Sequence, residues 1–318
     1  MTVSGVLLMT YGSPSSLDDL PRYLAAVRGG RPAEPELVAE MRRRYAHIGG
    51  SPLLRITAEQ AAALEARLGA GWKVASGMRF SDPSVEAGLR ALSVAGVRQV
   101  ATIVLSPQWS DLLMGGYRRA VEAALEAIGA EASAGAPAAA PTVRFAGAWH
   151  LEPAFVDGLA AGLAAAIATL PAGEQPSVPV LLSAHSLPRR VADEEPDYLE
   201  QLRATAEAVA ARAGLADGRW RFCWQSAGHS PGEWMRPDLV ELFPELRAAG
   251  HRSVVVAPIQ FLSDHLEVLY DLDVAARAQA DEAGLRYLRV PSLNAAPPLI
   301  EALASVARRT LAAADAAA

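Results

Sequence analysis

The sequence lacks the residues and segments on which several classes of protein depend. Its one cysteine, Cys223, excludes a disulfide framework and any cluster held by several thiolates, and it favours a cytoplasmic location. No stretch is apolar over the length that a transmembrane helix needs. The first apolar run, Val3–Thr10, lacks a basic leader and is followed by Tyr11-Gly12-Ser13-Pro14, so we expect a first strand there and no signal peptide.

Motifs of closed metal sites and of nucleotide binding are also missing. The sequence has no HExxH and no Cys-His finger pattern, so any metal would be bound transiently. Neither GxxxxGK[ST] nor GxGxxG follows an expected strand, which argues against nucleotide binding. The net charge of −6 argues against a general nucleic-acid-binding protein.

The 318 residues alternate between β-branched apolar runs and long helical stretches, and they do so twice. This alternation predicts two α/β domains with parallel sheets and right-handed crossovers. At 51% hydrophobic and 20% charged residues, the chain is long enough to give each domain its own core. The expected strands lie near Val3–Thr10, Trp72–Gly77, Gln99–Ser106 and Thr142–Ala148, and again near Val178–His185, Trp220–Gln225, Ser253–Pro258 and Arg286–Val290.

The pattern divides the chain into a first domain of residues 1–150 and a second of residues 151–318. A terminal helix is expected at about residues 297–314, and it could pack on either domain. The Ala/Gly/Pro-rich residues 129–141 are expected to form a loop.

Polar residues gather where the expected strands end, as in Ser106-Pro107-Gln108-Trp109 and His185-Ser186-Leu187-Pro188. Parallel sheets bind ligands outside the carboxyl ends of their strands, so we expect one cleft between two facing domains. His185 itself has two interpretations. A histidine after an apolar strand is commonly a satisfied core residue, but beside carboxylates a partly desolvated imidazole can accept protons or hold a divalent metal.

The stretch Pro258–Asp273, PIQFLSDHLEVLYDLD, runs from a strand into an amphipathic segment. If residues 262–273 are helical, Asp264, Glu267 and Asp271 share one face. That face is either solvated or the metal-handling wall of an active site, and its position after a strand favours the second interpretation. His265 lies about 100° around such a helix from Asp264, so we expect it to serve in packing.

Two further groups have both a structural and a functional interpretation. Arg28 and Arg44 lie beside glycine-rich turns, the second of which ends in Ser51, and arginine forks with a serine suit carboxylates or phosphates. An exposed basic helix face is the alternative. The apolar segment with Trp109, Leu112, Leu113, Met114 and Tyr117 is either core or a flexible lip that closes over a flat hydrophobic ligand.

Five motifs, taken together, resemble the ferrochelatases. They are LLMTYGSP at 7–14, RYAHIGGSPL at 44–53, SAHSLP at 183–188, WQSAG at 224–228 and FLSDHLEVLYDLD at 261–273, and they span nearly the whole chain in the family's order. The resemblance implies a metal-inserting lyase of haem and porphyrin biosynthesis, with the chelatase fold of two Rossmann-like domains and the active site in the cleft between them. Fe²⁺ would be a substrate and not a resident cofactor.

The resemblance also implies roles for individual residues. His185 matches the catalytic histidine and Glu267 the glutamate that faces it, while Tyr11, Asp264 and Asp271 complete the residues expected to handle the metal. A tyrosine after the first strand, as at Tyr11, resembles the coproporphyrin-using branch of the family, which is found in Gram-positive-type bacteria. Enzymes of that branch make Fe-coproporphyrin (coprohaem) from coproporphyrin III. Porphyrin-binding residues are expected at Tyr11, Arg28, Arg44, Ser51, Trp109, Met114 and Tyr117.

Some positions depart from the family's pattern. Ala275 stands where better-known members carry an acid of an outer metal site. Of that site Asp271 remains, and Asp273 is the candidate substitute for the missing acid. One cysteine cannot ligate an iron–sulfur cluster. We expect no tightly bound cofactor, no nucleic acid or membrane insertion, a monomer, and transient contact with neighbouring haem-pathway enzymes. The alternatives are a protoporphyrin IX ferrochelatase making protohaem, a cobalt chelatase and a non-catalytic tetrapyrrole carrier.

Overall fold

The chain divides into two compact units, which are described separately. The computed structural model describes residues 3–133, 139–227 and 232–312. The first unit comprises Met1–Trp149 and Asn294–Ala318, and the second comprises His150–Leu293. The terminal helix therefore belongs to the first unit, and the second domain expected at residues 151–318 is shorter by that segment.

The sheet of the first unit has four parallel strands in the order β2-β1-β3-β4. Helices cover both of its faces, which is why Val6, Leu7 and Leu8 of β1 are successive apolar residues that are all fully buried. The strands are β1 (Ser4–Thr10), β2 (Trp72–Met78), β3 (Gln99–Val104) and β4 (Thr142–Phe145).

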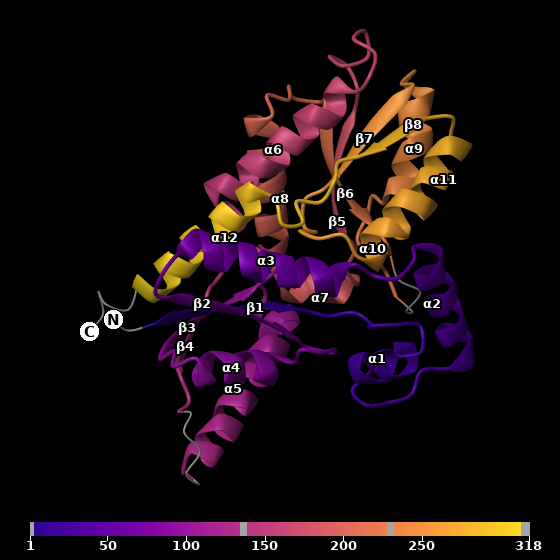
Figure 1. The fold of residues 1–318 in the computed structure, drawn as a ribbon. Coiled ribbons are helices and arrows are strands. Elements are labelled where there is room, and N and C mark those ends of the chain that lie inside the picture. Colours follow the sequence, from indigo (N-terminus) through magenta and orange to yellow (C-terminus); the bar gives the residue numbers. More distant parts are fainter. Residues whose placement is uncertain (1–2, 134–138, 228–231, 313–318) are drawn as a thin grey trace. The chain divides into compact units, whose positions relative to one another are not determined.

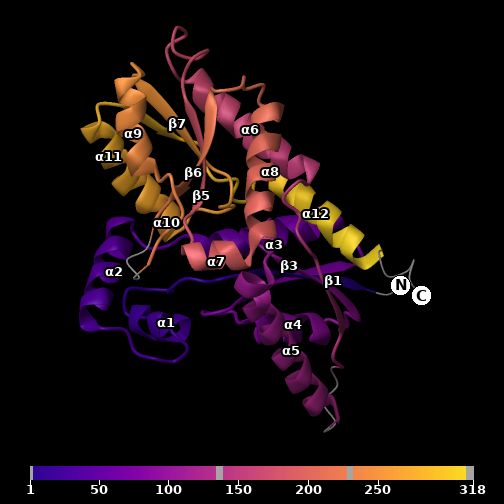
Figure 2. The ribbon, with the colours of Figure 1, turned by 180° about the vertical axis from the view of Figure 1, so that it is seen from behind.

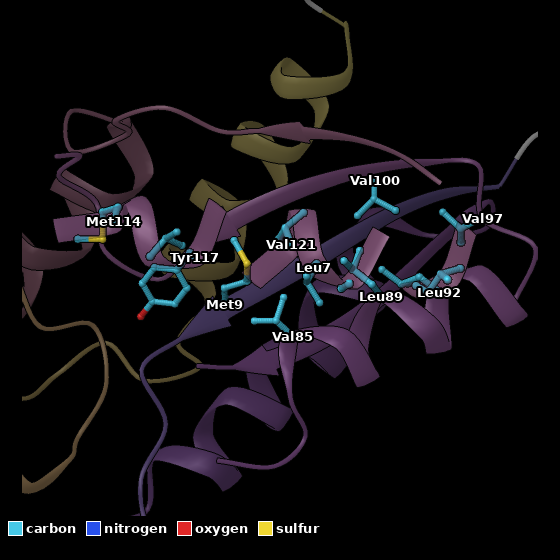
Figure 3. Close-up of a cluster of buried hydrophobic side chains, with 13 residues drawn as sticks. Leu7, Met9, Val85, Leu89, Leu92, Val97, Val100, Met114, Tyr117 and Val121 are labelled. Carbon is cyan, nitrogen blue, oxygen red and sulfur yellow. The ribbon is translucent and has the colours of Figure 1, made fainter. Parts of the chain in front are cut away.

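Helices α4 and α5 pack against one face of this sheet, and α3 and α12 against the other (Figures 1 and 2). Side chains of α4 and α5 meet those of β1 and β3 in a core that includes Leu7, Leu89 and Val121 (Figure 3). Helix α12 buries Leu299, Leu303 and other apolar residues of one stripe, which explains its place in this unit. The helices are α1 (Leu20–Val27), α2 (Pro35–His47), α3 (Leu53–Leu68), α4 (Val85–Val94), α5 (Asp111–Ser133) and α12 (Pro297–Ala312).

The sheet of the second unit also has four parallel strands, in the order β6-β5-β7-β8. Its strands are β5 (Val180–His185), β6 (Trp220–Gln225), β7 (Ser253–Pro258) and β8 (Arg286–Arg289). All eight strands expected from the sequence are thus confirmed, and so is their division into two parallel sheets flanked by helices.

Helices α6 and α8 lie on one face of the second sheet, and α9 and α11 on the other (Figure 2). The α9 side of the core includes Leu242, Phe243, Val254 and Tyr287. The helical segments are α6 (Pro153–Ala168), α7 (Arg189–Glu194), α8 (Pro196–Arg212), α9 (Leu239–Ala248), α10 (Leu266–Leu269), the π-helix η1 (Asp271–Ala276) and α11 (Arg277–Glu282).

Helix α5 is longer than the sequence predicts. The loop expected at residues 129–141 was predicted to begin too early, because α5 continues to Ser133. Residues 134–138 lie outside the described residues. Across the described parts of the chain, we find no helix with the length and apolar character required to span a bilayer.

Candidate active site

His185 is the last residue of β5, and its backbone and ring are both held by neighbours in the second unit. Gln260 Oε1 accepts a hydrogen bond from the His185 backbone N at 2.8 Å, and Gln260 Nε2 donates to the Tyr198 hydroxyl at 2.6 Å. His185 Nδ1 lies 2.6 Å from Ser186 O. Because a carbonyl only accepts, Nδ1 carries the proton, and Nε2 of the neutral ring is left with a lone pair.

The segment after β7 is not the continuous helix expected over residues 262–273. Its α-helix begins only at Leu266, and His265 has extended backbone with φ −156° and ψ −173°. After Leu269 the chain widens into the π-helix η1, where Ala275 N donates to Tyr270 O five residues earlier. Asp264 lies before the helix and Asp271 after the change of register, so Asp264, Glu267 and Asp271 do not form one ladder on an α-helical face.

Glu267, in the short helix α10, lies between two imidazoles. Its Oε2 is 3.9 Å from His185 Nε2 and 3.6 Å from His265 Nε2. Burial acts to raise the pKa of Glu267, but the charges of His185 and His265 outweigh it and hold that pKa well below its ordinary value. The carboxylate therefore stays ionised next to Nε2 of His185, where it stabilises a positive charge on that ring.

His265 reaches Glu267 because it precedes the helix. A position around an α-helix has no meaning for a residue with extended backbone, so the angle expected between His265 and Asp264 does not apply. His265 Nδ1 lies 2.9 Å from Ser263 O, and the Phe261 ring stacks edge-on at 4.6 Å. Burial lowers the pKa of His265, but Glu267 outweighs this effect and raises it above the ordinary value.

Two of the acidic residues lie against Arg289, a residue that no sequence motif singles out. Asp273 accepts both forks of the guanidinium, at 2.6 Å from Nε and 2.7 Å from Nη2. Asp264 Oδ1 is 3.6 Å from Nη1 of the same side chain. Both oxygens of Asp273, the residue expected to substitute for the acid missing at Ala275, thus accept hydrogen bonds from Arg289. Within the described residues no group of three or more His, Cys, Asp or Glu side chains is arranged to hold a metal ion.

Tyr11 directly follows β1 in the first unit and is 42% exposed. Its ring meets that of Phe80 edge-on, with centroids 4.6 Å apart. The Arg79 guanidinium lies over the rings of Phe80 and Tyr117, at 4.6 and 5.2 Å from their centroids. These residues come from the ends of β1 and β2 and from α5, so the edge of the sheet gathers two phenols and a cation.

Arg79 is a residue that the sequence reasoning missed. It is half-buried and makes no ion pair with any carboxylate in the described part of the chain. A side chain at Gly116 would collide with its guanidinium, so glycine there makes room for the cation. A partly desolvated guanidinium is stabilised by an anion, which makes Arg79 a candidate binding group for a carboxylate.

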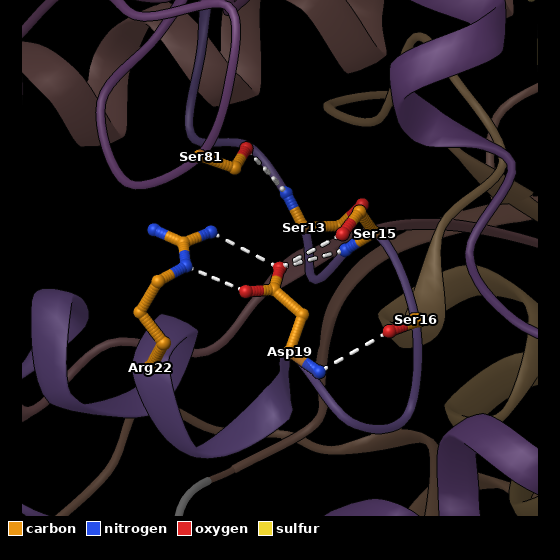
Figure 4. Close-up of polar contacts among 6 residues, drawn as sticks. All are labelled: Ser13, Ser15, Ser16, Asp19, Arg22 and Ser81. Atoms are coloured by element: carbon orange, nitrogen blue, oxygen red, sulfur yellow. Dashed lines mark hydrogen bonds and ion pairs between the residues drawn. The ribbon is translucent and has the colours of Figure 1, made fainter.

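The turn that follows Tyr11 is fixed by Asp19 (Figure 4). Asp19 Oδ2 accepts hydrogen bonds from Ser15 N at 3.0 Å and Ser15 Oγ at 3.2 Å, and the carboxylate pairs with Arg22 through both oxygens. Ser13 N donates to Ser81 Oγ at 3.2 Å, which ties the turn to the segment after β2. These bonds hold the backbone that carries Tyr11.

The other residues expected to bind porphyrin have varied surroundings. Arg28 is exposed at the end of α1, whereas Arg44 pairs with Glu40 at 2.7 Å. Ser51 Oγ accepts a hydrogen bond from Leu53 N at 3.3 Å. Trp109 is half-buried and donates from Nε1 to Asp111.

The segment expected to form a flexible lip is divided between core and surface. Met114 and Tyr117 are 9% and 5% exposed and belong to the core, so the packing interpretation holds for them, whereas Leu112 is 50% exposed. Burial also raises the pKa of Tyr117. Leu112, in the first turn of α5, is therefore the residue of this segment that presents an exposed apolar side chain.

Two solved structures share this architecture. SirB from Bacillus subtilis with Fe³⁺ matches with a TM-score of 0.55 at 13% identity, covering 99% of this chain and 98% of that one. CbiX, described as the terminal enzyme of sirohaem biosynthesis in denitrifying bacteria, matches with a TM-score of 0.53 at 15% identity, covering 96% and 98%. The chain therefore has the chelatase fold.

The family model described as Ferrochelatase matches residues 3–311, and the chain belongs to the ferrochelatase family. A protein named ferrochelatase from Deinococcus radiodurans is 39% identical over 309 residues, covering 96% of this chain and 95% of that protein. Proteins named coproporphyrin III ferrochelatase from Geobacillus kaustophilus and Bacillus subtilis are 35% and 32% identical, covering 95% and 96% of this chain and 94% and 97% of theirs. The protein is thus a metal-inserting enzyme of haem biosynthesis.

Proposed function

We propose that this enzyme inserts Fe²⁺ into coproporphyrin III and releases coprohaem. The observation that carries the proposal is the group at the end of β1 and β2, where exposed Tyr11 lies close to Arg79, a cation without a carboxylate partner among the described residues. Exposed Arg28 in the same unit adds a second cation. A porphyrin with four propionates is better matched to several such cations than one with two. The names of several relatives support the same substrate.

The reaction exchanges one divalent metal for two protons. Fe²⁺ loses its water ligands and binds the four ring nitrogens, and the two pyrrole N–H groups release their protons. In the proposed mechanism His185 accepts the first proton at Nε2, which its Nδ1–H bond to Ser186 leaves unprotonated in the neutral ring, and it accepts the second after the first has passed on through the pair of Glu267 and His265. The ionised carboxylate of Glu267 stabilises the resulting imidazolium and shares the proton with His265.

The metal-handling residues proposed here are Tyr11, His185 and Glu267, with Asp271 as an outer carboxylate. Asp271 contributes to the raised pKa of His265, which places its charge close to that ring. Asp264 is directed at Arg289, so we assign it to the support of the site and not to the metal. Fe²⁺ is a substrate in this proposal, and no resident cofactor takes part.

Binding of the flat ring supplies the remaining energy. Trp109 and exposed Leu112 offer apolar surface at the start of α5. Contacts that fit a bent ring better than a flat one would direct the nitrogen lone pairs toward the metal, a distortion of about 1–5 kcal/mol.

The test is anaerobic Fe²⁺ insertion followed by absorbance, with coproporphyrin III and protoporphyrin IX offered in parallel. A higher kcat/KM for coproporphyrin III supports the proposal. Preference for protoporphyrin IX would retain the ferrochelatase and overturn the choice of substrate. Insertion into neither ring, with tight retention of haem, would indicate a carrier.

A further inference from the structure

Arg289 connects three segments of the second unit that are separate in sequence. It is the last residue of β8, and its side chain is only 11% exposed. Its guanidinium pairs through two hydrogen bonds with Asp273 in η1, approaches Asp264 in the segment before α10, and donates to Val290 O at 3.3 Å. One planar cation is thus fixed from several directions.

The two carboxylates lie on either side of Glu267 in the chain. Asp264 lies three residues before it, ahead of the extended His265, and Asp273 follows it in the π-helix η1. Between them lie His265 and Glu267, whose Nε2 and Oε2 atoms are 3.6 Å apart. Carboxylates on both sides of Glu267 thus lie against one guanidinium.

The helical geometry alone does not hold the segment. Helix α10 comprises four residues, and after Tyr270 the hydrogen-bond register changes to that of the π-helix η1, so no continuous α-helical ladder fixes the orientation of α10. The Arg289 forks add charge-assisted hydrogen bonds in a largely buried setting, where such bonds are short and directional. The strand that carries Arg289 is itself paired with β7, the strand from which the segment leaves.

We propose that Arg289 is a positioning residue for metal insertion, which acts by holding Asp264 and Asp273 and thereby fixing Glu267 between His185 and His265. This inference rests on the proposed function, because it needs Glu267 to act on the ring protons or the metal. It also assigns Asp264 and Asp273 to the support of the site. Arg289 is largely buried and its guanidinium faces these two carboxylates, so we expect its loss to change the rate of the chemical step and not the affinity for the porphyrin.

The experiment compares the R289M variant with the wild type in kcat, KM for the porphyrin and melting temperature. We expect kcat to fall by about 10- to 100-fold, as displacement of a reacting group by an ångström typically does, while KM stays within about twofold. R289K, which keeps the charge but loses the planar fork, should retain an intermediate kcat. The R221M variant is the matched control, because Arg221 pairs with Glu245 on the exposed surface of the same unit.

A double variant separates positioning from stability. R289M leaves Asp273 as a partly buried carboxylate without its cation, and D273N/R289M removes that charge as well. We expect the double variant to regain melting temperature but not kcat. Recovery of both, or an R289M enzyme that is less stable yet turns over normally, would overturn the proposal. A wild type that inserts no metal into either porphyrin would instead reject the proposed function.

Discussion

Nε2 of His185 lies 3.9 Å from Oε2 of Glu267, although the two residues come from different strand ends of the second sheet. His185 closes β5, and Glu267 follows β7, which pairs with β5 in parallel. Adjacent parallel strands end at the same edge, so their carboxyl ends bring the imidazole and the carboxylate together. The imidazole of this pair can accept a proton, and the carboxylate beside it can stabilise the imidazolium that results.

Replacing His185 with alanine should reduce Fe²⁺ insertion by about 100-fold or more, because a general base typically contributes about 10²- to 10⁴-fold. Porphyrin binding, measured by quenching of its fluorescence, should stay within a few-fold of the wild type. H251A is the control, since His251 precedes β7 at the opposite edge of the sheet. Near-normal turnover in H185A would contradict the assigned role.

Replacing Arg79 with methionine should raise KM for coproporphyrin III by about 10-fold, since a charge-assisted hydrogen bond contributes about 1.5–3 kcal/mol. The value of kcat should change little, because Arg79 is not proposed to move protons. The R55M variant removes an exposed arginine that already pairs with Glu59 and should leave KM unchanged. If R79M binds the porphyrin as well as the wild type does, Arg79 is not a carboxylate-binding residue.

Replacing Asp19 with asparagine should lower the free energy of unfolding by about 1 kcal/mol at pH 7. The hydrogen bond from Arg22 lowers the pKa of Asp19 from 3.8 to about 2. A lowered pKa in the folded state gives a contribution that is complete above pH 3.8 and is lost as the pH falls through about 2. The difference between wild type and D19N should therefore be constant above about pH 5 and shrink toward pH 2.

Urea unfolding at pH 7 and pH 3 measures this difference. D18N is the control, because the Asp18 side chain is 99% exposed and should contribute little at either pH. A D19N difference that grows as the pH falls would have the wrong sign for this explanation.

Replacing Gly12 with alanine should destabilise the first unit by about 1–3 kcal/mol. Gly12 has φ +94°, and a Cβ there would collide with Ser81 Oγ, whose partner is the backbone N of Ser13. G49A provides the comparison, since Gly49 has φ +72° but no atom within 4 Å of an added Cβ. Thermal unfolding of both variants separates the two effects, because G49A introduces backbone strain alone and G12A adds the collision. Equal losses of stability in the two variants would show that the collision at Gly12 is relieved without cost.

The sequence by itself determined the two sheets and the residues at their strand ends. Runs such as Ser253–Pro258 are apolar throughout because a parallel strand is covered on both faces, and this pattern is local. His185 could be selected because it directly follows such a run. Glu267 could be selected because it follows β7, the apolar strand that pairs with β5 in the same sheet.

Only the tertiary structure decided how the acidic residues are used. An α-helical pattern over residues 262–273 places Asp264, Glu267 and Asp271 on one face, but the extended His265 and the π-helix remove that face. Arg289 lies 16 residues from Asp273, and Arg79 lies 38 residues from Tyr117. Nothing near either arginine in sequence distinguishes it from a surface arginine. Their function depends on which partners the folded sheet edges bring close to them. The local periodicity of apolar residues does not predict such long-range contacts.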